Sequence, residues 1–312
     1  MVHRHKMVTI RPFDGSPEDA EGLLLVERAT FDESPYSPAE VQAMLGGQGQ
    51  QAWLALAGDE VVGFVAAFLT RGLGGGCWEI DLLAVHPDWG RRGIATRLIR
   101  AAADGGKGAA PRARAVVALE NEGSAGAFLR AGFRAQPEVQ ELFIGRFEEL
   151  DPVPSVTVGV TVRGAPDPAE IRPWRPDLPQ PPDSPSREAL DAAPAPGGVS
   201  LLVAEGSGGS SGQRGEGYAE LIWVQTLLYR GVWIESLAVS TAAARGALVR
   251  AAVERAAAAG VDEIGALVPA GRQAFKDALR AAGLRSLGEF RWLVADLPLP
   301  GLATPPPTGE PA

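Results

Sequence analysis

The chain has 312 residues, of which 46% are hydrophobic, and its formal net charge is −9, from 29 basic and 38 acidic residues. This length predicts two domains with buried cores, and the acidic balance argues against a nucleic-acid partner, which favours a basic surface. No apolar run approaches the roughly 18 residues of a membrane span, and no signal peptide is recognisable. Cys77 is the single cysteine, which excludes an internal disulfide framework. We therefore expect a cytoplasmic protein without membrane contact.

The first 150 residues predict short strands mixed with helices. Ser16 and Ser37 are typical helix N-caps, because a proline suited to the first helical turn follows each of them. Gly58-Asp59 between two apolar runs is typical of a hairpin. The expected strands are 8–11, 52–57, 61–70, 79–85, 113–119 and 139–147, and the expected helices are 17–29, 38–45, 123–130 and one that begins at 94. His3 and His5 form an H-x-H pair, which we interpret as part of a solvated terminal tail rather than a metal site.

The segment from Cys77 to Ala101 predicts a strand, a tight turn and a helix. Between strand and helix lies a Gly/Arg loop, 90–93, and the unpaired N–H groups at a helix start favour an anion. Gly93 allows close backbone approach, while Arg91 and Arg92 add positive charge. The loop therefore predicts a phosphate or pyrophosphate site, although strand–Gly–Arg–Gly–helix segments that bind nothing also occur.

Two motifs in this half resemble the GNAT superfamily of acyl-CoA-dependent N-acetyltransferases. The first is Leu83-Ala84-Val85-His86-Pro87 followed by Gly90-Arg91-Arg92-Gly93-Ile94-Ala95, in which Gly93 and Ala95 match the family pattern while Gly90 and Arg91 depart from it. The second is Asn121 followed by Ala127-Phe128-Leu129-Arg130-Ala131-Gly132-Phe133 at the family spacing. The resemblance covers about residues 8–148.

The resemblance implies an α/β (α+β) fold, with a mixed, mostly antiparallel twisted sheet flanked by helices. It also implies acetyl-CoA as co-substrate and no metal. The cofactor contacts that it implies are the backbone of Leu83, Ala84 and Val85, the pyrophosphate loop of Arg91, Arg92, Gly93, Ile94, Ala95 and Thr96, and the positions Asn121 and Phe128. Asn121 can equally be a plain helix cap.

The reaction requires a base for the attacking amine, and a carboxylate with a tuned pKa can serve. Glu79 and Asp81 share one face of the predicted strand, and we expect Glu79 to be the base, with Asp81 second. The alternative is that both are polar strand residues. Phe128 stands where many relatives have a tyrosine that protonates the leaving thiolate, and phenylalanine has no proton to give. Tyr36 is expected either to face the substrate or to pack at the rim.

After residue 150 the pattern repeats, which predicts a duplicated domain. Val160–Arg163 echoes Val8–Arg11, and Gly231–Val239 echoes Gly76–Val85 with one residue fewer. A helix at 243–259, a strand at 264–268 and a helix at 271–282 are expected in the same order. The segment 240–246 has one glycine, one arginine and no His-Pro turn, so we interpret this copy as GNAT-like in fold but degenerate in its cofactor site.

The predicted organisation is a GNAT catalytic domain at 1–150, a degenerate GNAT-like domain at 151–300 with a Pro-rich segment at 164–198, and a disordered tail at 301–312. A short helix is expected near 187–192, and 206–217 should be an enlarged hairpin loop. The predicted activity is transfer of acetyl from acetyl-CoA to a primary amine of a small molecule or peptide, by a monomer or homodimer. The alternatives are a protein N-terminal amine as acceptor, and a catalytically weak CoA-binding sensor or scaffold.

Overall fold

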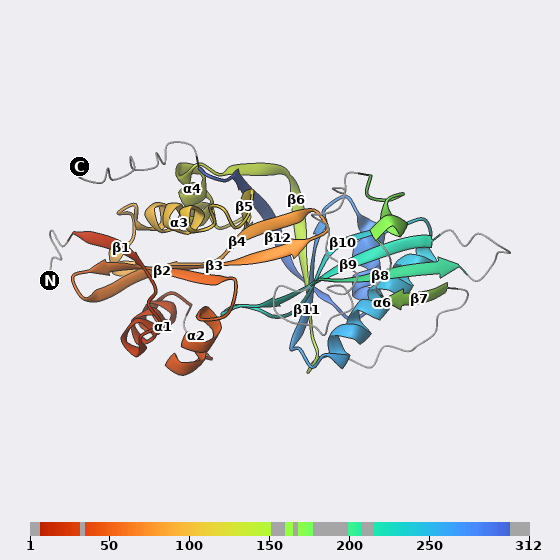
Figure 1. The fold of residues 1–312 in the computed structure, drawn as a ribbon, viewed down its shortest axis with the longest axis horizontal. Coiled ribbons are helices and arrows are strands. Elements are labelled where there is room, and N and C mark those ends of the chain that lie inside the picture. Colours follow the sequence, from red (N-terminus) through yellow and green to blue (C-terminus); the bar gives the residue numbers. More distant parts are fainter. Residues whose placement is uncertain are drawn as a thin grey trace, which may run out of the picture.

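The computed structural model describes residues 7–31, 35–150, 160–164, 168–176, 199–206 and 215–299. Twelve strands in these ranges form one sheet, in the order β1-β2-β3-β4-β5-β12-β6-β11-β10-β9-β8-β7. Figure 1 shows an elongated molecule in which the first half of the chain lies at one end and the second half at the other. We call residues 1–150 the first half and residues 151–300 the second half. The mixed, mostly antiparallel α/β architecture predicted from the sequence is confirmed.

The elements of the first half follow the predicted order. Ser37 caps α2 in a reciprocal capping box with Glu40, as its sequence context indicates. Residues 58–59 lie between β2 and β3 at the expected hairpin. The bounds are β1 (Val8–Pro12), α1 (Pro17–Phe31), α2 (Pro38–Leu45), β2 (Gln50–Ala57), β3 (Glu60–Gly72), β4 (Gly75–Val85), the 3-10 turn η1 (Pro87–Trp89), α3 (Ile94–Gly105), β5 (Arg112–Ala118), α4 (Glu122–Ala131) and β6 (Arg134–Arg146).

The second half repeats this order over its described residues. The bounds are β7 (Val160–Gly164), the 3-10 turn η2 (Pro168–Ile171), β8 (Val199–Gly206), β9 (Gly215–Gln225), β10 (Arg230–Val239), α6 (Ala242–Ala258), β11 (Glu263–Pro269), α7 (Gln273–Ala281) and β12 (Arg285–Asp296). The expected helix near 187–192, the tail at 301–312, most of the Pro-rich segment and the centre of the loop at 206–217 lie outside the described residues.

The two halves exchange their last strands. β12 pairs antiparallel with β5 of the first half, and β6 pairs antiparallel with β11 of the second half. β6 and β12 also pair with each other at the centre of the sheet, where Figure 1 shows β6 crossing between the halves. The sheet therefore does not divide at residue 150, although the sequence predicts the domain boundary there.

Helices cover both faces of the sheet in the first half, as Figure 1 shows. One core lies beneath α3 and α4 and contains Leu98, Ile99 and Phe128. The opposite core lies beneath α1 and α2, and it includes Leu227 from the loop between β9 and β10. Since Leu227 is only 4% exposed, a residue of the second half completes a core of the first half.

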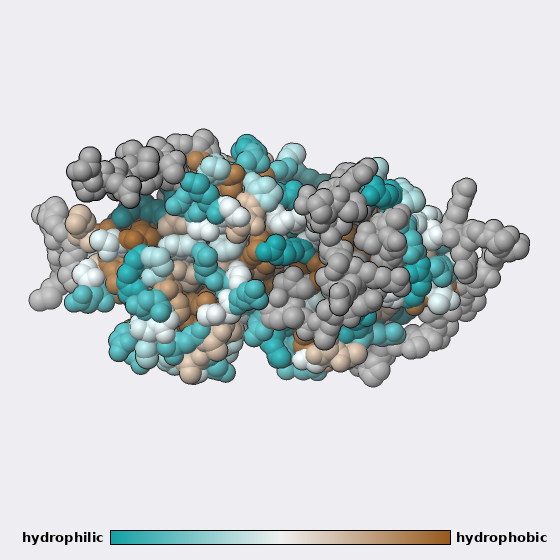
Figure 2. All heavy atoms as spheres, in the orientation of Figure 1, coloured by the Kyte–Doolittle hydropathy of each residue, from teal (hydrophilic) through white to brown (hydrophobic). Residues whose placement is uncertain are grey.

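The second half has an equivalent core on one face of its sheet, beneath α6 and α7. In Figure 2 hydrophilic residues are widespread on the coloured part of the surface, and hydrophobic residues show between them at one end and near the middle of the molecule. No described helix has the length and apolar character that a membrane crossing requires. Within the described ranges no group of three or more His, Cys, Asp or Glu residues could hold a metal ion.

Candidate active site

Strands β4 and β5 diverge at the point where the sequence motifs begin. The two parallel strands pair at only two positions in the described range 35–150, Trp78 with Ala113 and Glu79 with Arg114. Past Glu79 the edge of β4 turns away from β5, which leaves an opening between neighbouring strands. Leu83, Ala84 and Val85 lie on this diverging end of β4, beside the opening.

Strand β4 contains a β-bulge beside Asp81. The register between β3 and β4 shifts between Ile80 and Leu83, where β4 carries one extra residue. Trp78 and Ile80 belong to the core beneath α3, and past the bulge Leu83 and Val85 pack against the same core. Asp81 lies on the face of β4 that also carries Glu79, as alternation predicts, and the extra residue changes the alternation only after it.

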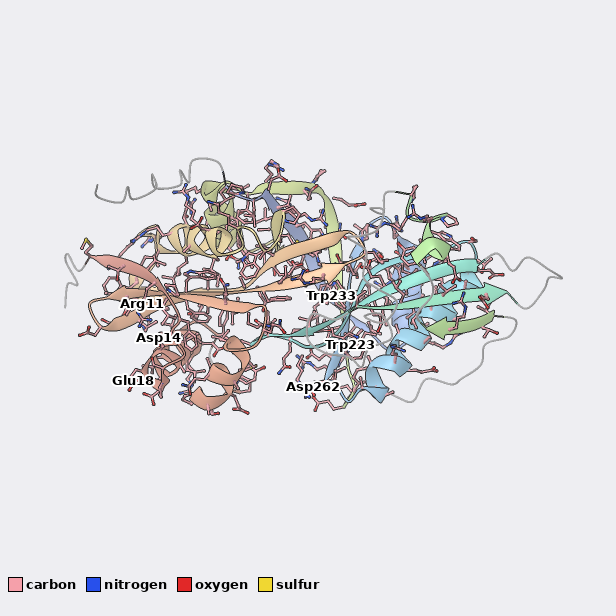
Figure 3. All side chains as sticks on the ribbon, viewed as in Figure 1. Arg11, Asp14, Glu18, Trp223, Trp233 and Asp262 are labelled. Carbon is pink, nitrogen blue, oxygen red and sulfur yellow. The ribbon has the colours of Figure 1, made fainter. Side chains whose placement is uncertain are left out.

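Glu79 and Asp81 line a cavity of ≈ 370 Å³ between the two halves. Its walls come from β3, β4, β5 and β6 of the first half and from β9, β10, β11 and β12 of the second, together with the loop that connects β9 to β10. Figure 3 labels Trp233, a lining residue on β10, where the ribbons of the two halves meet. The residues predicted for the site all belong to the first half, whereas the cavity that Glu79 and Asp81 line is built from both halves.

Both carboxylate oxygens of Glu79 take part in an ion-pair network at the cavity wall. The Nε atom of Arg114 donates to both Glu79 carboxylate oxygens, at 2.7 and 2.8 Å, and the Thr70 hydroxyl donates to Oε1 at 2.7 Å. The Nη1 atom of Arg114 donates to Glu235 on β10 at 2.7 Å. The guanidinium also stacks on the Trp292 ring, 4.4 Å from its centroid. This network is the arrangement expected of a buried structural ion pair.

Asp81 is the carboxylate with free acceptor capacity. Its Oδ2 atom is buried and accepts no hydrogen bond in the part of the chain that the structure describes. Burial raises the pKa of Asp81 from 3.8 to about 6; the charge of Glu79 adds to the shift, and a hydrogen bond with Thr226 opposes it. A carboxylate of this kind accepts a proton readily near neutral pH.

The loop between β4 and α3 has the backbone of an anion site. Gly93 is the N-cap of α3 in the left-handed region, with φ 74°, and no side chain caps the helix start. Arg91 also has a positive φ of 59°, which is uncommon for a residue with a side chain and is often found at functional sites. Arg92 lies over the Trp89 ring, 4.6 Å from its centroid, and its Nη2 donates to the Asp88 carbonyl oxygen. The free N–H groups of α3 thus lie beside two arginines.

Three residues of the helix start differ in their surroundings. Ile94 is buried in the core beneath α3, Ala95 packs at the edge of that core, and the Thr96 hydroxyl donates to the Ala127 carbonyl oxygen at 3.4 Å. These side chains face the protein, so only their backbone groups are available to a ligand.

The remaining predicted residues have structural partners. Asn121 caps α4, since its Oδ1 accepts the Ser124 N–H at 3.0 Å. Phe128 is buried in the core in edge-to-face contact with Phe133, with ring centroids 5.1 Å apart. Tyr36 is half-buried beside the core beneath α1 and α2, and burial, together with nearby carboxylates that include Glu27, raises its pKa.

The comparisons with known proteins concern the fold that carries this site. Residues 23–133 match the family model described as Acetyltransferase (GNAT) family. The fold is that of GNAT proteins. No curated protein matches the sequence.

Three solved structures match nearly the whole chain. A GCN5-related N-acetyltransferase from Sphaerobacter thermophilus is 18% identical with a TM-score of 0.57, over 93% of this chain and 95% of its own. A putative acetyltransferase from Pyrococcus horikoshii is 18% identical with a TM-score of 0.53, over 96% and 94%. A tandem GNAT protein from the clavulanic acid biosynthesis pathway is 13% identical with a TM-score of 0.51, over 93% and 98%. At these identities the likeness concerns the fold alone.

The second half differs from the first half at the helix start that follows β10. A cavity of ≈ 440 Å³ lies between the end of β10 and the start of α7, where the repeat places the counterpart of the first-half loop. Thr241 caps α6 by accepting the Ala244 N–H at 3.1 Å, and its hydroxyl donates to Glu216 at 2.8 Å. A side-chain oxygen and a carboxylate therefore lie at the helix start, which in the first half is left open.

Sequence reasoning assigned no site role to the residues that the second half contributes to the cavity. These residues, Thr226, Tyr229, Trp233 and Glu235, are more than 70 residues from the two family motifs of the first half, and they reach the cavity because the two halves associate. Arg114 could have been found, because it lies between alanines inside a strand of small apolar residues and a buried charge needs a partner.

Proposed function

We propose that the protein transfers an acetyl group from acetyl-CoA to a primary amine that enters the cavity between the halves. The carrying observation is Asp81, a partly desolvated carboxylate at the divergence of β4 and β5, with one unpartnered oxygen. The match of residues 23–133 to the GNAT family supports acetyl transfer as the reaction class.

The residues present fit acetyl-CoA. Its pyrophosphate would be held by the uncapped start of α3 with Arg91 and Arg92, and its thioester arm by the unpaired edge of β4 at Leu83–Val85. When bound, acetyl-CoA supplies an activated acyl carbon. The cavity residues Asp81 and Glu79 lie at the inner end of the same strand, so the amine and the thioester would meet at the bulge.

The base is assigned to Asp81 rather than to Glu79. Both oxygens of Glu79 accept hydrogen bonds from Arg114, and protonating this carboxylate would break the ion pair. Asp81 instead takes the proton of the attacking nitrogen while the C–N bond forms and the C–S bond breaks. The raised pKa of Asp81, about 6, suits a base that works near neutrality.

The leaving thiolate takes its proton from solvent in this proposal. Phe128, at the position of the usual acid, is buried in the α3 core and carries no exchangeable proton. A thiol has an ordinary pKa of roughly 8.5, so a CoA thiolate leaves without an acid at a reduced rate.

The test is release of free CoA from acetyl-CoA across a panel of small primary amines and short peptides, with wild type and Asp81→Asn in parallel. Turnover that depends on an amine and is lost in Asp81→Asn supports the proposal. Acetyl-CoA binding without turnover for any amine would instead identify a sensor or scaffold. Turnover with peptides alone would assign the acceptor to protein N-termini.

A further inference from the structure

The loop that joins β9 to β10 forms a wall of the cavity. It is anchored in the first half, because Leu227 is buried beneath α1 and α2 and the Gln50 side chain donates to the Gln225 carbonyl oxygen at 2.6 Å. The Thr226 hydroxyl accepts the N–H groups of Leu228 and Tyr229, at 3.1 and 3.0 Å, which fixes the turn. The wall is therefore built into the fold and does not depend on a ligand.

Together with the adjoining strand β10, this loop presents apolar and aromatic side chains, which we call the second-half wall. Leu228, Tyr229 and Trp233 all line the cavity. Tyr229 meets Trp233 edge-to-face at 5.8 Å between ring centroids, and its hydroxyl donates to the Val232 carbonyl oxygen at 2.6 Å. Its polar end is thus occupied, and the rings offer a hydrophobic surface to an occupant.

Gly265 on β11 makes room for the Trp233 ring. A Cβ added at this glycine would lie 2.7 Å from Trp233, so no larger residue fits there without a shift. Trp233 on β10 pairs with Gly265 on β11, and this pair corresponds to the pair of Glu79 on β4 with Arg114 on β5 in the first half. The second half therefore has an aromatic ring where its counterpart has a charge.

The charges around the cavity favour a cation. Four carboxylates and two arginines line it among the described residues. Glu79 and Glu235 share Arg114, and Glu263 pairs with Arg146 at 3.0 Å. Asp81 has no basic partner among the ion pairs of the described residues. An amine is protonated in solution, so an excess of negative charge attracts it to the cavity.

We propose that the acceptor is a primary amine carried on an apolar body about the size of an aromatic ring, and that Leu228 and Trp233 of the second half select it. The amine lies at Asp81 and the body lies against the second-half wall. This inference rests on the proposed function, because it identifies the acceptor of the same site. It also gives the degenerate half a role as the acceptor-binding part of the enzyme.

The experiment compares three amines on the full chain: 2-phenylethylamine, ethanolamine and β-alanine. Burying a phenyl group from water is worth about 10- to 100-fold, so kcat/KM for phenylethylamine should exceed that for ethanolamine by this factor. The carboxylate of β-alanine meets the negative cavity, and its turnover should be the lowest. Calorimetry with phenylethylamine measures binding independently of turnover.

Two variants locate the selectivity. Leu228→Ser changes a side chain that is 63% exposed, so the fold should tolerate it, and Trp233→Ala removes the ring. Both should reduce the preference for phenylethylamine over ethanolamine by at least about fivefold, while the Kd for acetyl-CoA stays unchanged. Leu25→Ser is the matched control, since Leu25 is 65% exposed on α1, away from the cavity, and this variant should keep the preference.

The outcomes separate the inference from the function on which it rests. Phenylethylamine binding without CoA release would support the acceptor site and contradict the transferase. Turnover of ethanolamine or β-alanine equal to that of phenylethylamine would overturn the acceptor class. If Leu228→Ser and Trp233→Ala keep the preference for phenylethylamine, the role of the second-half wall is overturned. The same holds if Leu25→Ser loses as much phenylethylamine binding as these two variants do.

Discussion

Arg114 and Glu235 are 121 residues apart in the chain and form a two-bond ion pair, Nη1–Oε1 at 2.7 Å and Nη2–Oε2 at 2.9 Å. The same guanidinium holds Glu79 through Nε. One arginine of the first half therefore bridges a carboxylate from each half at the cavity wall. Because the pair is mostly buried, it ties the shape of the candidate site to the association of the halves.

Removing this arginine should destabilise the whole fold. In Arg114→Met, two buried carboxylates lose their partner, which is expected to lower the free energy of unfolding by about 3–5 kcal/mol in thermal or urea denaturation. Arg134→Met is the control, because Arg134 pairs with Asp296 at an exposed position and its loss should cost at most about 1 kcal/mol. Equal stability of the two variants would show that the bridge adds nothing.

Replacing the proposed base should affect turnover and not cofactor binding. With a working acceptor, Asp81→Asn is expected to lower kcat by about 10²- to 10⁴-fold while the Kd for acetyl-CoA is unchanged. Glu79→Gln should lose stability through the weakened ion pair and should lose less kcat. The reverse order of the two kcat losses would return the role of base to Glu79.

The pKa of Asp81 also predicts opposite effects of pH on activity and on stability. Activity needs the charged form, so kcat/KM should fall about tenfold per pH unit below about pH 6. Between pH 3.8 and about pH 6 the Asp81 carboxyl is protonated in the folded chain and ionised in the unfolded chain. The contribution of Asp81 to the free energy of unfolding therefore decreases as the pH rises through this range. The difference in unfolding free energy, Asp81→Asn minus wild type, should therefore be more favourable to the variant at pH 8 than at pH 4. Denaturation of both proteins at both pH values measures this difference.

A negative charge in the loop before α3 should weaken acetyl-CoA binding. Gly93→Asp places a carboxylate at the uncapped helix start and should weaken acetyl-CoA binding by at least about 100-fold in calorimetry. Gly93→Ala shares the cost of the left-handed backbone, about 1–2 kcal/mol, without the charge. If both variants bind equally well, the loop does not hold the pyrophosphate.

Titration of the full chain should saturate at one acetyl-CoA. The start of α6 is occupied by the Thr241 hydroxyl and the Glu216 carboxylate, which oppose an anion. In Glu216→Gln with Thr241→Gly, a weak second site should emerge at the cavity lined by Arg245 and Arg272. A stoichiometry of two in wild type would show that the second half has kept its cofactor site.

The sequence by itself determined the elements of each half and the repeat that relates them. Ser37 and its proline specify the start of α2, and Gly58-Asp59 specifies the β2–β3 hairpin, because caps and turns depend on a few neighbouring residues. The anion loop at Gly93 was predicted for the same reason, since a helix start and two arginines are adjacent in the chain. The use of this loop for acetyl-CoA stays a prediction.

Only the tertiary structure decided which strands are neighbours and which carboxylate is free. The repeat predicts two sheets, yet β6 and β12 exchange places, because strand pairing between equivalent edges has no signature in local sequence. Glu79 and Asp81 look alike in a strand of alternating residues. Arg114 pairs with the first and is itself held by Glu235, while the second is buried with one oxygen unpartnered among the described residues, and both effects depend on residues far away in the chain.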